Sequence, residues 1–586
     1  MRQWMVAAKK ADFYAIAEKF HVDPVVARII RNREVIGEKN IRIYLGGNLS
    51  DLSDPHQMKD MDRLVEILAQ KIRKQVHIRI IGDYDVDGVT SSHLFLTALR
   101  RVGAKVDVVI PHRIQDGYGL SLHLLQQAKE DGVDTILTCD NGIAAIDEIA
   151  WAKAQKMTVL VTDHHAVPFE EHEGRRTEKK SLADAVVNPH QQDCRYPYKE
   201  LCGAGVAWNV IRVLYENYDM DKREAEDLLD FVAMATVCDV MSLTGENRIL
   251  VKEGLKRIRH TKNIGLQALM QACNVQPENI SAYHFGYVLG PCVNATGRLD
   301  TARHALRLFE TGQETEAEEI ARDLVDLNQE RKELTLQGVE IAKKLCEEGG
   351  YENDPILVLF LPDVHESIAG LIAGRIREMY NRPVFVLTRG EEGVKGSGRS
   401  TENYSMYENM CGCAELFTKF GGHPMAAGLS LPEENVEKFR RKINENCPLT
   451  VEEVCPDIHI DMAMPVGYAS TELVHQFALL EPFGKDNPSP LFADRNLSIS
   501  RMWVIGKNRN VLRMSVLSEY GQPVPVIFFG DVETLFAYFT EKFGQEEVEN
   551  ALHGRKNRIL FSMVYTAKID FYQGNENLQL EMKYYR

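Results

Sequence analysis

The stretch from Ile78 to Ser92, IRIIGDYDVDGVTSS, constrains the fold more strongly than any other part of the chain. It begins with an apolar run typical of a β-strand, which ends at Gly82. The carboxylates of Asp83, Asp85 and Asp87 alternate behind this run, and a helical pattern of apolar residues follows. Carboxylates crowded at one strand end repel one another unless a cation neutralises them. Taken alone, the stretch is equally well explained by one Asp that caps the helix and two that are solvated.

Two patterns alternate from residue 78 to about residue 189. Short runs rich in Val and Ile, as expected for strands buried on both faces, are separated by longer helical patterns. We therefore expect strands at 77–82, 105–111, 134–139, 158–162 and 184–188, and helices at 89–102, 121–131 and 145–155. This order predicts an α/β fold with an open parallel sheet, in which ligands collect beyond the carboxyl ends of the strands.

Polar side chains follow two further strands of this predicted sheet. Asp140 follows the run DTILTC, and the run TVLVT is followed by Asp163, His164 and His165. Three separate strands therefore deliver carboxylates or imidazoles to one edge of the sheet. A metal site explains this repetition better than three unrelated polar strand ends.

A fourth contribution comes from the predicted helix 224–239. This helix is apolar over most of its length and ends in Asp239. A carboxylate at the end of a buried helix needs a compensating partner, because helix C-termini disfavour anions. That partner is either the metal site or an Arg side chain such as that of Arg248. We expect Asp230 of the same helix to be solvated.

The donor set indicates which metal such a site would hold. It consists of carboxylate oxygens with one or two imidazoles and no thiolate, which favours Mg²⁺ or Mn²⁺ over structural zinc. The carboxylates exceed what one divalent ion requires, so two ions that share a carboxylate fit better. Such pairs of ions cleave phosphoester bonds.

Composition limits the class of protein but leaves its partner open. A chain of 586 residues is long enough for several domains, and its 44% hydrophobic content suits globular folds. The net charge of −16 argues mildly against a nucleic-acid partner, although metal-binding carboxylates contribute to it. The start, MRQWMVAAKK, lacks an apolar segment of signal-peptide length, and we expect a cytoplasmic protein with reduced cysteines.

The rest of the chain predicts three further parts. Residues 314–348 lack Pro and show helical spacing, which predicts a long helix connecting two domains; a dimerising coiled coil is the alternative, but the heptad pattern is not sustained. Residues 353–445 show a second α/β pattern, with the glycine-rich stretches GSGRS and FGGHP interpreted as turns that suit phosphate binding or as ordinary tight turns. Residues 455–586 read as short strands of a small barrel.

An aromatic residue in the predicted barrel is surrounded by cations. Trp503 is followed by Lys507, Arg509 and Arg513. This combination suits a single strand whose bases stack on aromatic rings while its phosphates meet positive charge. A core Trp beside a solvated basic loop is an equally good explanation of these residues.

The motifs together resemble those of a known superfamily. GDYDVDG, TCDNG, TDHH and ATVCDV are similar to the successive motifs of the DHH phosphoesterases, and the DYDVDG form resembles the RecJ branch. Further RecJ-like signatures are GAGVAW at 203–208, NATGRLD at 294–300, GSGRS at 396–400 and FGGHPMAAG at 420–428. The resemblance extends from about residue 30 to the end of the chain.

The resemblance implies roles for particular residues. The implied metal ligands are Asp85, Asp87, Asp140, His164 and Asp239, with Asp140 bridging two ions of Mn²⁺ or Mg²⁺. In small-substrate branches a His lies four residues before the DxD motif; Ile81 occupies that position, and Asp83 is the expected replacement. His165 is expected beside the scissile phosphate. The expected substrate-binding residues are Arg113, Asn294, Arg298, His365, Ser397, Arg399, His423, Trp503 and Arg509.

The resemblance also implies an organisation and an activity. The expected parts are a helical segment 1–75, a DHH catalytic domain 76–310, a connecting helix 311–350, a DHH-associated substrate-binding domain 351–450 and an OB-fold 451–586. The implied activity is 5′→3′ exonuclease cleavage of single-stranded DNA to 5′-mononucleotides in DNA repair and recombination. A helicase and a single-strand-binding protein are implied partners. The alternatives are a phosphodiesterase for short oligonucleotides or cyclic dinucleotides, and a noncatalytic DNA-binding scaffold.

Overall fold

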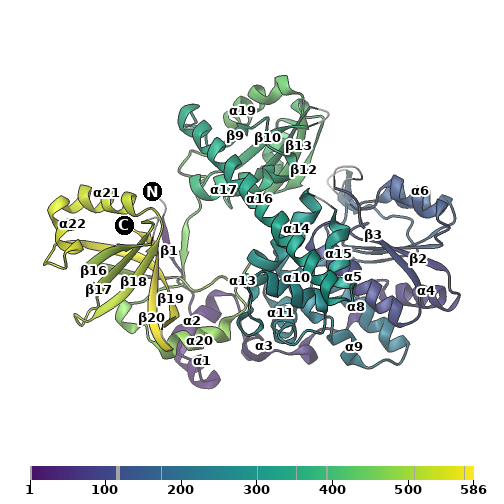
Figure 1. Ribbon diagram of the computed structural model, residues 1–586, viewed down its shortest axis with the longest axis horizontal. Coiled ribbons are helices and arrows are strands. Elements are labelled where there is room, and N and C mark those ends of the chain that lie inside the picture. Colours follow the sequence, from purple (N-terminus) through teal and green to yellow (C-terminus); the bar gives the residue numbers. More distant parts are fainter. Residues whose placement is uncertain are drawn as a thin grey trace. The chain divides into compact units, whose positions relative to one another are not determined.

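The computed structural model describes residues 3–113, 116, 119–172, 175–299, 301–351, 353–390, 393–506, 509–572 and 574–586. These residues form two compact units (Figure 1). The first unit contains Leu52–Met241 and Glu246–Pro456, and the second contains Gln3–Asp51, Ser242–Gly245 and Asp457–Arg586.

The first unit begins with the predicted parallel sheet. Its strand order is β3-β2-β4-β5-β8, and every neighbouring pair is parallel. The strands are β2 (His77–Ile81), β3 (Lys105–Val109), β4 (Thr135–Cys139), β5 (Thr158–Thr162) and β8 (Ala185–Val187). Because β2 comes first in the chain and lies between β3 and β4, the strand order reverses beside it. Ligands of open α/β sheets bind beyond the strand ends at such a reversal.

Helices cover both faces of this sheet. One face is packed against α4, α5 and α8, and an apolar cluster that includes Leu125 and Ile149 joins α6 and α7 to the other. The helices of this region are α4 (Met61–Arg73), α5 (Val86–Arg101), α6 (Leu122–Glu130), α7 (Ile146–Ala154), α8 (Gly203–Asn217), α9 (Lys222–Glu226), α10 (Leu229–Cys238), α11 (Gly245–Ile258), α12 (Ile264–Ala272), α13 (Ala282–His284), α14 (Gly290–Leu299) and α15 (Ala302–Glu310). A π-helical turn, η4 (Phe285–Leu289), joins α13 to α14, and a small hairpin of β6 (Phe169–His172) and β7 (Arg175–Glu178) follows β5.

The long helix α16 (Glu314–Glu348) continues without interruption over the predicted residues. It packs against α12 and α14 in its first part and against α17 (Ala369–Tyr380) further along. It therefore connects the first sheet region to the second, as predicted.

The second sheet of this unit has the order β12-β13-β11-β10-β9. Its elements are β9 (Leu357–Phe360), β10 (Val384–Gly390), β11 (Gly393–Arg399), β12 (Lys419–His423) and β13 (Ala426–Leu431), with α17, α18 (Met406–Cys411) and α19 (Val436–Glu445). The prediction of turns for the two glycine-rich stretches was wrong, because residues 396–399 lie in strand β11 and residues 421–423 lie in strand β12. A Cβ atom at Gly398 would lie 2.3 Å from Sδ of Met406 and 2.8 Å from Cε1 of Phe385, so close packing on the sheet requires this glycine.

The second unit is a closed barrel joined to the N-terminal helices. Its strands run in the order β15-β16-β17-β18-β20-β19, and pairing of β16 with β19 closes the ring. The strands are β15 (Met462–Ala463), β16 (Phe492–Ile505), β17 (Val511–Leu517), β18 (Pro523–Phe529), β19 (Leu560–Tyr572) and β20 (Asn575–Tyr585). The helices are α20 (Thr471–Phe477), α21 (Val532–Phe543) and α22 (Gln545–Leu552).

Helices α1 (Phe13–Phe20), α2 (Pro24–Asn32) and α3 (Glu38–Gly46) share the apolar core of this barrel. Strand β1 (Trp4–Val6) also pairs with β14 (Ile458–Ile460). The predicted segment 1–75 is therefore divided, because α4 belongs to the first unit. In the described part of the chain, no helix combines the length and the apolar character needed to cross a membrane.

Candidate active site

The acidic stretch after β2 places its carboxylates around the N-terminus of α5. Asp85 is the N-cap of this helix, and its Oδ1 accepts a hydrogen bond of 3.1 Å from the amide of Gly88. Asp83 is buried, and its Oδ1 accepts a hydrogen bond of 3.3 Å from the amide of Gly119. Asp83, Asp85 and Asp140 each offer a ligand atom, and these atoms lie within 4.8 Å of one another.

Asp87 is held by the N-terminus of α8. The amides of Gly203 and Ala204 donate hydrogen bonds of 2.6 Å and 2.7 Å to its Oδ2 and Oδ1. A helix N-terminus stabilises a carboxylate because unpaired amides and the helix dipole both favour negative charge. The first turn of α8 thus fixes both oxygens of Asp87 in the centre of the site.

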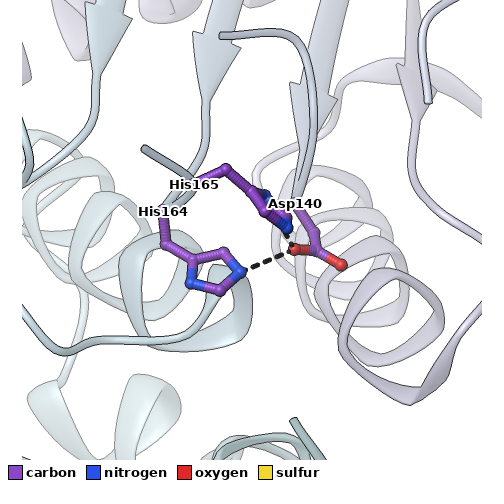
Figure 2. A group of neighbouring side chains, drawn as sticks. All are labelled: Asp140, His164 and His165. Carbon is purple, nitrogen blue, oxygen red and sulfur yellow. Dashed lines mark ion pairs between the residues drawn. The ribbon is translucent and has the colours of Figure 1, made fainter. Parts of the chain in front are cut away.

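Asp140 lies at the end of β4 in the left-handed backbone region, with φ of 61°. This conformation turns its carboxylate toward His164 and His165, as Figure 2 shows. Oδ1 of Asp140 lies 3.0 Å from Nε2 of His164 and 3.9 Å from Nδ1 of His165. A Cβ atom at Gly203 would lie 2.6 Å from Cβ of Asp140, so only glycine lets α8 approach this close.

His164 joins the sheet edge to helix α10. Its Nε2 lies 3.6 Å from Oδ2 of Asp87 and 3.6 Å from Oδ2 of Asp239, the C-cap residue of α10. These three residues form a second group of ligand atoms within 4.8 Å of one another, and Asp140, His164 and His165 form a third. All seven residues predicted for the catalytic cluster therefore lie in overlapping groups at one sheet edge. Asp230, which we expected to be solvated, is instead buried on α10 and accepts a hydrogen bond from Thr261, because its side of the helix packs in the core.

Asp163 accepts hydrogen bonds from both histidines. Its Oδ1 accepts hydrogen bonds from the amide of His164 at 2.7 Å and from Nδ1 of His165 at 2.8 Å. Its Oδ2 accepts a hydrogen bond of 2.9 Å from the amide of Ile143. A carboxylate on Nδ1 fixes the orientation of an imidazole ring and directs Nε2 outward.

The electrostatics of the cluster favour a bound cation. Burial, followed by repulsion from neighbouring carboxylates, raises the pKa of Asp83, Asp85 and Asp140. Burial lowers the pKa of His164, which keeps its imidazole neutral and able to act as a ligand. The pKa of His165 rises to about 9: burial opposes protonation, but the hydrogen bond to Asp163 and nearby carboxylates outweigh it. This oxygen-rich donor set with neutral imidazole fits Mg²⁺ or Mn²⁺.

A pocket of about 510 Å³ lies next to this cluster in the first unit. Its lining contains the guanidinium groups of Arg113, Arg298 and Arg399, and no carboxylate in the described part of the chain lies within 4.0 Å of any of them. Burial, followed by repulsion from Arg113 and other cations, lowers the pKa of Arg298 to about 10. Burial and neighbouring arginines lower the pKa of Arg399 as well. Partly buried guanidiniums that repel one another form a site for an anion.

Tyr84 joins the arginine pocket to the carboxylate cluster. Its ring lines the pocket, and the guanidinium carbon of Arg113 lies 5.0 Å from the ring centroid. Ser397 lines the same pocket, and Nη1 of Arg298 donates a hydrogen bond of 2.6 Å to the carbonyl of Ser367. Asn294 accepts a hydrogen bond of 3.2 Å from the amide of Val86, between Asp85 and Asp87.

The remaining predicted substrate-binding residues lie outside this pocket. His365 is exposed and caps the turn η5 (Glu366–Ile368), with its Nδ1 2.7 Å from Oγ of Ser367. His423 is exposed at the end of β12. In the second unit, Trp503 of β16 pairs with Arg513 of β17, and Arg509 lies in the turn between these strands. Lys507 lies outside the described residues.

Three family models match the chain in order. They are the N-terminal domain of the DHH family over residues 77–236, the DHHA1 domain over 353–447 and the RecJ OB domain over 460–584. These matches confirm the predicted DHH, DHH-associated and OB-fold parts.

Curated relatives match over most of the chain. The single-stranded-DNA-specific exonuclease RecJ of Haemophilus influenzae is 32% identical over 96% of this chain and 96% of its own length. The RecJ of Escherichia coli is 32% identical over 95% of each chain, and that of Bacillus subtilis is 33% identical over 87% of this chain but only 63% of its own length. The chain belongs to the RecJ family. A solved structure of Thermus thermophilus RecJ in complex with Mn²⁺ has a TM-score of 0.81 at 25% identity, covering all of this chain and 79% of that one.

Sequence reasoning missed two supports of this RecJ-family site. Asp163 was noted only as the start of a motif, although four hydrogen bonds converge on it. The Gly203 and Ala204 amides were also missed, although the motif GAGVAW contains both residues. Backbone donors leave little signal in a sequence, because any residue except Pro carries one.

Proposed function

We propose that this RecJ-family chain degrades single-stranded DNA from the 5′ end and releases 5′-mononucleotides, with two Mn²⁺ or Mg²⁺ ions. One observation carries the proposal. Among the described residues, no carboxylate pairs with the three arginines of the pocket, and the pocket adjoins a cluster of carboxylates and imidazoles; the one carboxylate in the pocket lining, that of Glu366, pairs with Lys395 instead. The names of the curated relatives support the choice of single-stranded DNA.

The proposed metal ligands are Asp83, Asp85, Asp87, Asp140, His164 and Asp239. Their overlapping groups share Asp140 and His164, which suits two neighbouring ions that share a bridging carboxylate. When bound, such a pair supplies an activated water and charge neutralisation for in-line displacement at phosphorus. The chain's own residues orient the reaction: the α8 amides hold Asp87, and Asp163 holds His165 so that Nε2 can donate to a phosphate oxygen.

The proposed polarity rests on recognition of the terminal phosphate. Arg113, Arg298 and Arg399, with Ser397, would surround a 5′ phosphate, whose charge relieves the repulsion among the guanidiniums. Charge-assisted hydrogen bonds to phosphate contribute roughly 1.5–3 kcal/mol each. Loss of one arginine should therefore lower kcat/KM by about ten- to a hundredfold on phosphorylated ends.

The barrel supports a long single strand as substrate. Trp503 is 38% exposed, and Arg501, Arg509 and Arg513 lie on the same hairpin or its turn. Aromatic rings among cations bind single strands without sequence preference. A nuclease of this type needs duplex DNA to be opened first, so a helicase and a single-strand-binding protein are the proposed partners. The proposed place is the cytoplasm and the proposed role is DNA repair and recombination; all eleven cysteines are free thiols, as expected in a reducing compartment.

The deciding experiment compares ends and variants. Strands labelled at the 3′ end, with a 5′ phosphate or a 5′ hydroxyl, are given to wild type, Arg399→Ala and Arg375→Ala with Mn²⁺, and EDTA serves as the metal control. Arg375 is a matched control because its side chain is 69% exposed on α17 and pairs with Glu378. We expect Arg399→Ala to lose activity mainly on the phosphorylated strand, and Arg375→Ala to match wild type.

Two results would overturn parts of the proposal. Equal loss of activity on both ends would remove Arg399 from end recognition. Shortening of the strand from its 3′ end, or activity in EDTA, would contradict the polarity or the metal requirement.

A further inference from the structure

Two tyrosines stand exposed and stacked on the first unit. The side chains of Tyr283 and Tyr287 are 61% and 71% exposed, their ring centroids lie 5.1 Å apart, and their planes are inclined by 24°. Aromatic rings usually bury most of their surface, so a stacked exposed pair marks a place where a flat ligand can add to the stack.

The opposite side of this segment is firmly anchored. Ser281 and His284 form a capping box at the start of α13, with Nδ1 of His284 3.1 Å from the amide of Ser281. Phe285 and Leu289 are fully buried, and Sγ of Cys238 donates a hydrogen bond of 3.3 Å to the carbonyl of Phe285. Cys238 is the last residue of α10 and precedes Asp239. This hydrogen bond therefore fixes the tyrosine-bearing segment beside the end of α10 that carries Asp239 of the candidate active site.

The tyrosines begin an incompletely buried stripe along one helical segment. From α13 through η4 and α14, the stripe follows helical spacing and contains Tyr283, Tyr287, Pro291, Asn294 and Arg298. Arg298 lines the arginine pocket, and Asn294 is bonded to the amide between Asp85 and Asp87. Tyr287 lies eleven residues before Arg298, about 16 Å along a helix.

We propose that Tyr283 and Tyr287 form a stacking platform for bases of the DNA strand on the 3′ side of the cut. This inference rests on the proposed function and extends it. The stripe gives these contacts an order. The terminal phosphate would lie at Arg298, the cleaved bond beside Asn294, and the following bases at Tyr287 and then Tyr283. A strand that enters the arginine pocket with its 5′ end therefore continues toward the tyrosines.

A single strand fits this surface better than a protein partner. Every base has a flat face, so a tyrosine platform accepts any sequence, as an exonuclease requires. The stripe is also continuous with the arginine pocket. One DNA strand could therefore contact the pocket and the tyrosines along the same helical segment. A protein that covered the tyrosines would block this path.

The test uses the full-length protein in EDTA, where bound strands stay intact, and measures the dissociation constant of a long single strand. The variants are Tyr283→Ala, Tyr287→Ala, the double variant and the matching Phe substitutions. Tyr14→Ala is the matched control, because Tyr14 is 78% exposed on α1 of the second unit. Stacking on one ring contributes about fivefold or more to affinity. We expect that loss for each Ala variant, retention for each Phe variant and no change for Tyr14→Ala.

Two further measurements separate this inference from the proposed function. Hydrolysis of a 5′-phosphorylated dinucleotide with Mn²⁺ should be unchanged in every tyrosine variant, because the dinucleotide ends before the platform. A strand with abasic sites over the platform should bind wild type and the double variant equally. The platform would be overturned if the double Ala variant bound the strand with wild-type affinity. It would also be overturned if wild type and the double variant preferred intact over abasic strands to the same extent. Absence of dinucleotide hydrolysis in wild type would instead contradict the proposed function.

Discussion

Nδ1 of His165 donates a hydrogen bond of 2.8 Å to Oδ1 of Asp163, a carboxylate buried beneath the two histidines. This hydrogen bond fixes the orientation of the His165 ring beside the proposed metal ligands. Residues that orient a functional side chain in this way usually affect activity about 10- to 100-fold when replaced.

We expect Asp163→Asn to lower kcat by that factor while leaving KM nearly unchanged. An amide cannot provide both the acceptor for His165 and the acceptor for the Ile143 amide, so the ring loses its fixed orientation. Steady-state cleavage of a 5′-phosphorylated strand measures the effect. Asp147→Asn, an exposed change in the first turn of α7, is the control. Equal kcat values for the two variants would show that Asp163 does not position His165.

A second prediction concerns Asp140 and metal removal. Burial and the surrounding carboxylates raise the pKa of Asp140, so its charge destabilises the metal-free protein. Asp140→Asn should therefore raise the unfolding temperature in EDTA, abolish cleavage and remove the stabilisation that Mn²⁺ gives wild type. Asn tolerates the left-handed conformation of residue 140, so the fold should persist.

Asp219→Asn is a suitable control for this change. Asp219 also has a left-handed backbone, with φ of 51°, but it is exposed. Thermal unfolding with EDTA and with Mn²⁺ measures both variants. A Mn²⁺-induced shift of wild-type size in Asp140→Asn would remove Asp140 from the metal site.

The shared core of the second unit leads to a prediction about truncation. Removing only residues 457–586 should yield an aggregating protein, because Val26, Ile29 and Ile30 of α2 would lose the apolar core they share with the barrel. A fragment of residues 52–456 should instead stay monodisperse and hydrolyse a dinucleotide at a comparable rate. Its affinity for a long strand should fall about tenfold or more, since the barrel's stacking contacts are lost. Size-exclusion chromatography and strand binding measure these outcomes, and loss of dinucleotide hydrolysis in a folded fragment would place part of the active site in the second unit.

His93 of α5 should make stability depend on pH. Its ring is buried 4.4 Å from that of Phe231, and burial, followed by repulsion from Arg100, lowers its pKa to about 3. Below pH 6.5 the unfolded chain binds a proton that the folded protein does not, so stability is lost as pH falls. At pH 5 this loss amounts to about 2 kcal/mol.

Replacement of His93 should remove that dependence. The urea midpoint of wild type should be lower at pH 5 than at pH 7.5, because protonation of His93 in the unfolded chain alone costs about 2 kcal/mol of stability. This difference between the two midpoints should be smaller in His93→Phe. It should remain unchanged in the control His459→Gln, because the side chain of His459 is exposed on β14. An unchanged pH dependence in His93→Phe would mean that another group titrates in this range.

Local patterns predicted the parts of the fold that local physics determines. The five strands of the first sheet and helix α16 were placed almost to the residue, because their apolar periodicity is uninterrupted. The turn assignment for GSGRS failed because glycine also permits close packing within a sheet, as at Gly398. The burial of Asp230 and the contribution of α2 to the barrel core depend on partners distant in sequence, which no local pattern reports.

The same limit applies to the candidate site. Its carboxylates and imidazoles were predicted because each follows a strand or ends a helix, and the sheet brings those ends together. Asp163 and the α8 amides were not, because their importance comes from what they touch rather than from their chemistry.

The position of Tyr84 between Asp83 and Asp85 has a consequence for product length. Its ring lines the pocket proposed for the terminal phosphate, while the residues on either side belong to the cluster proposed for cleavage. Consecutive Cα atoms are about 3.8 Å apart, so the residue that contacts the terminal phosphate and the residues beside the cleaved bond are neighbours in one short segment. The spacing between the pocket for the terminal phosphate and the cleavage site is therefore constant. Every turnover then releases a product of the same length, whatever the length or sequence of the strand that remains.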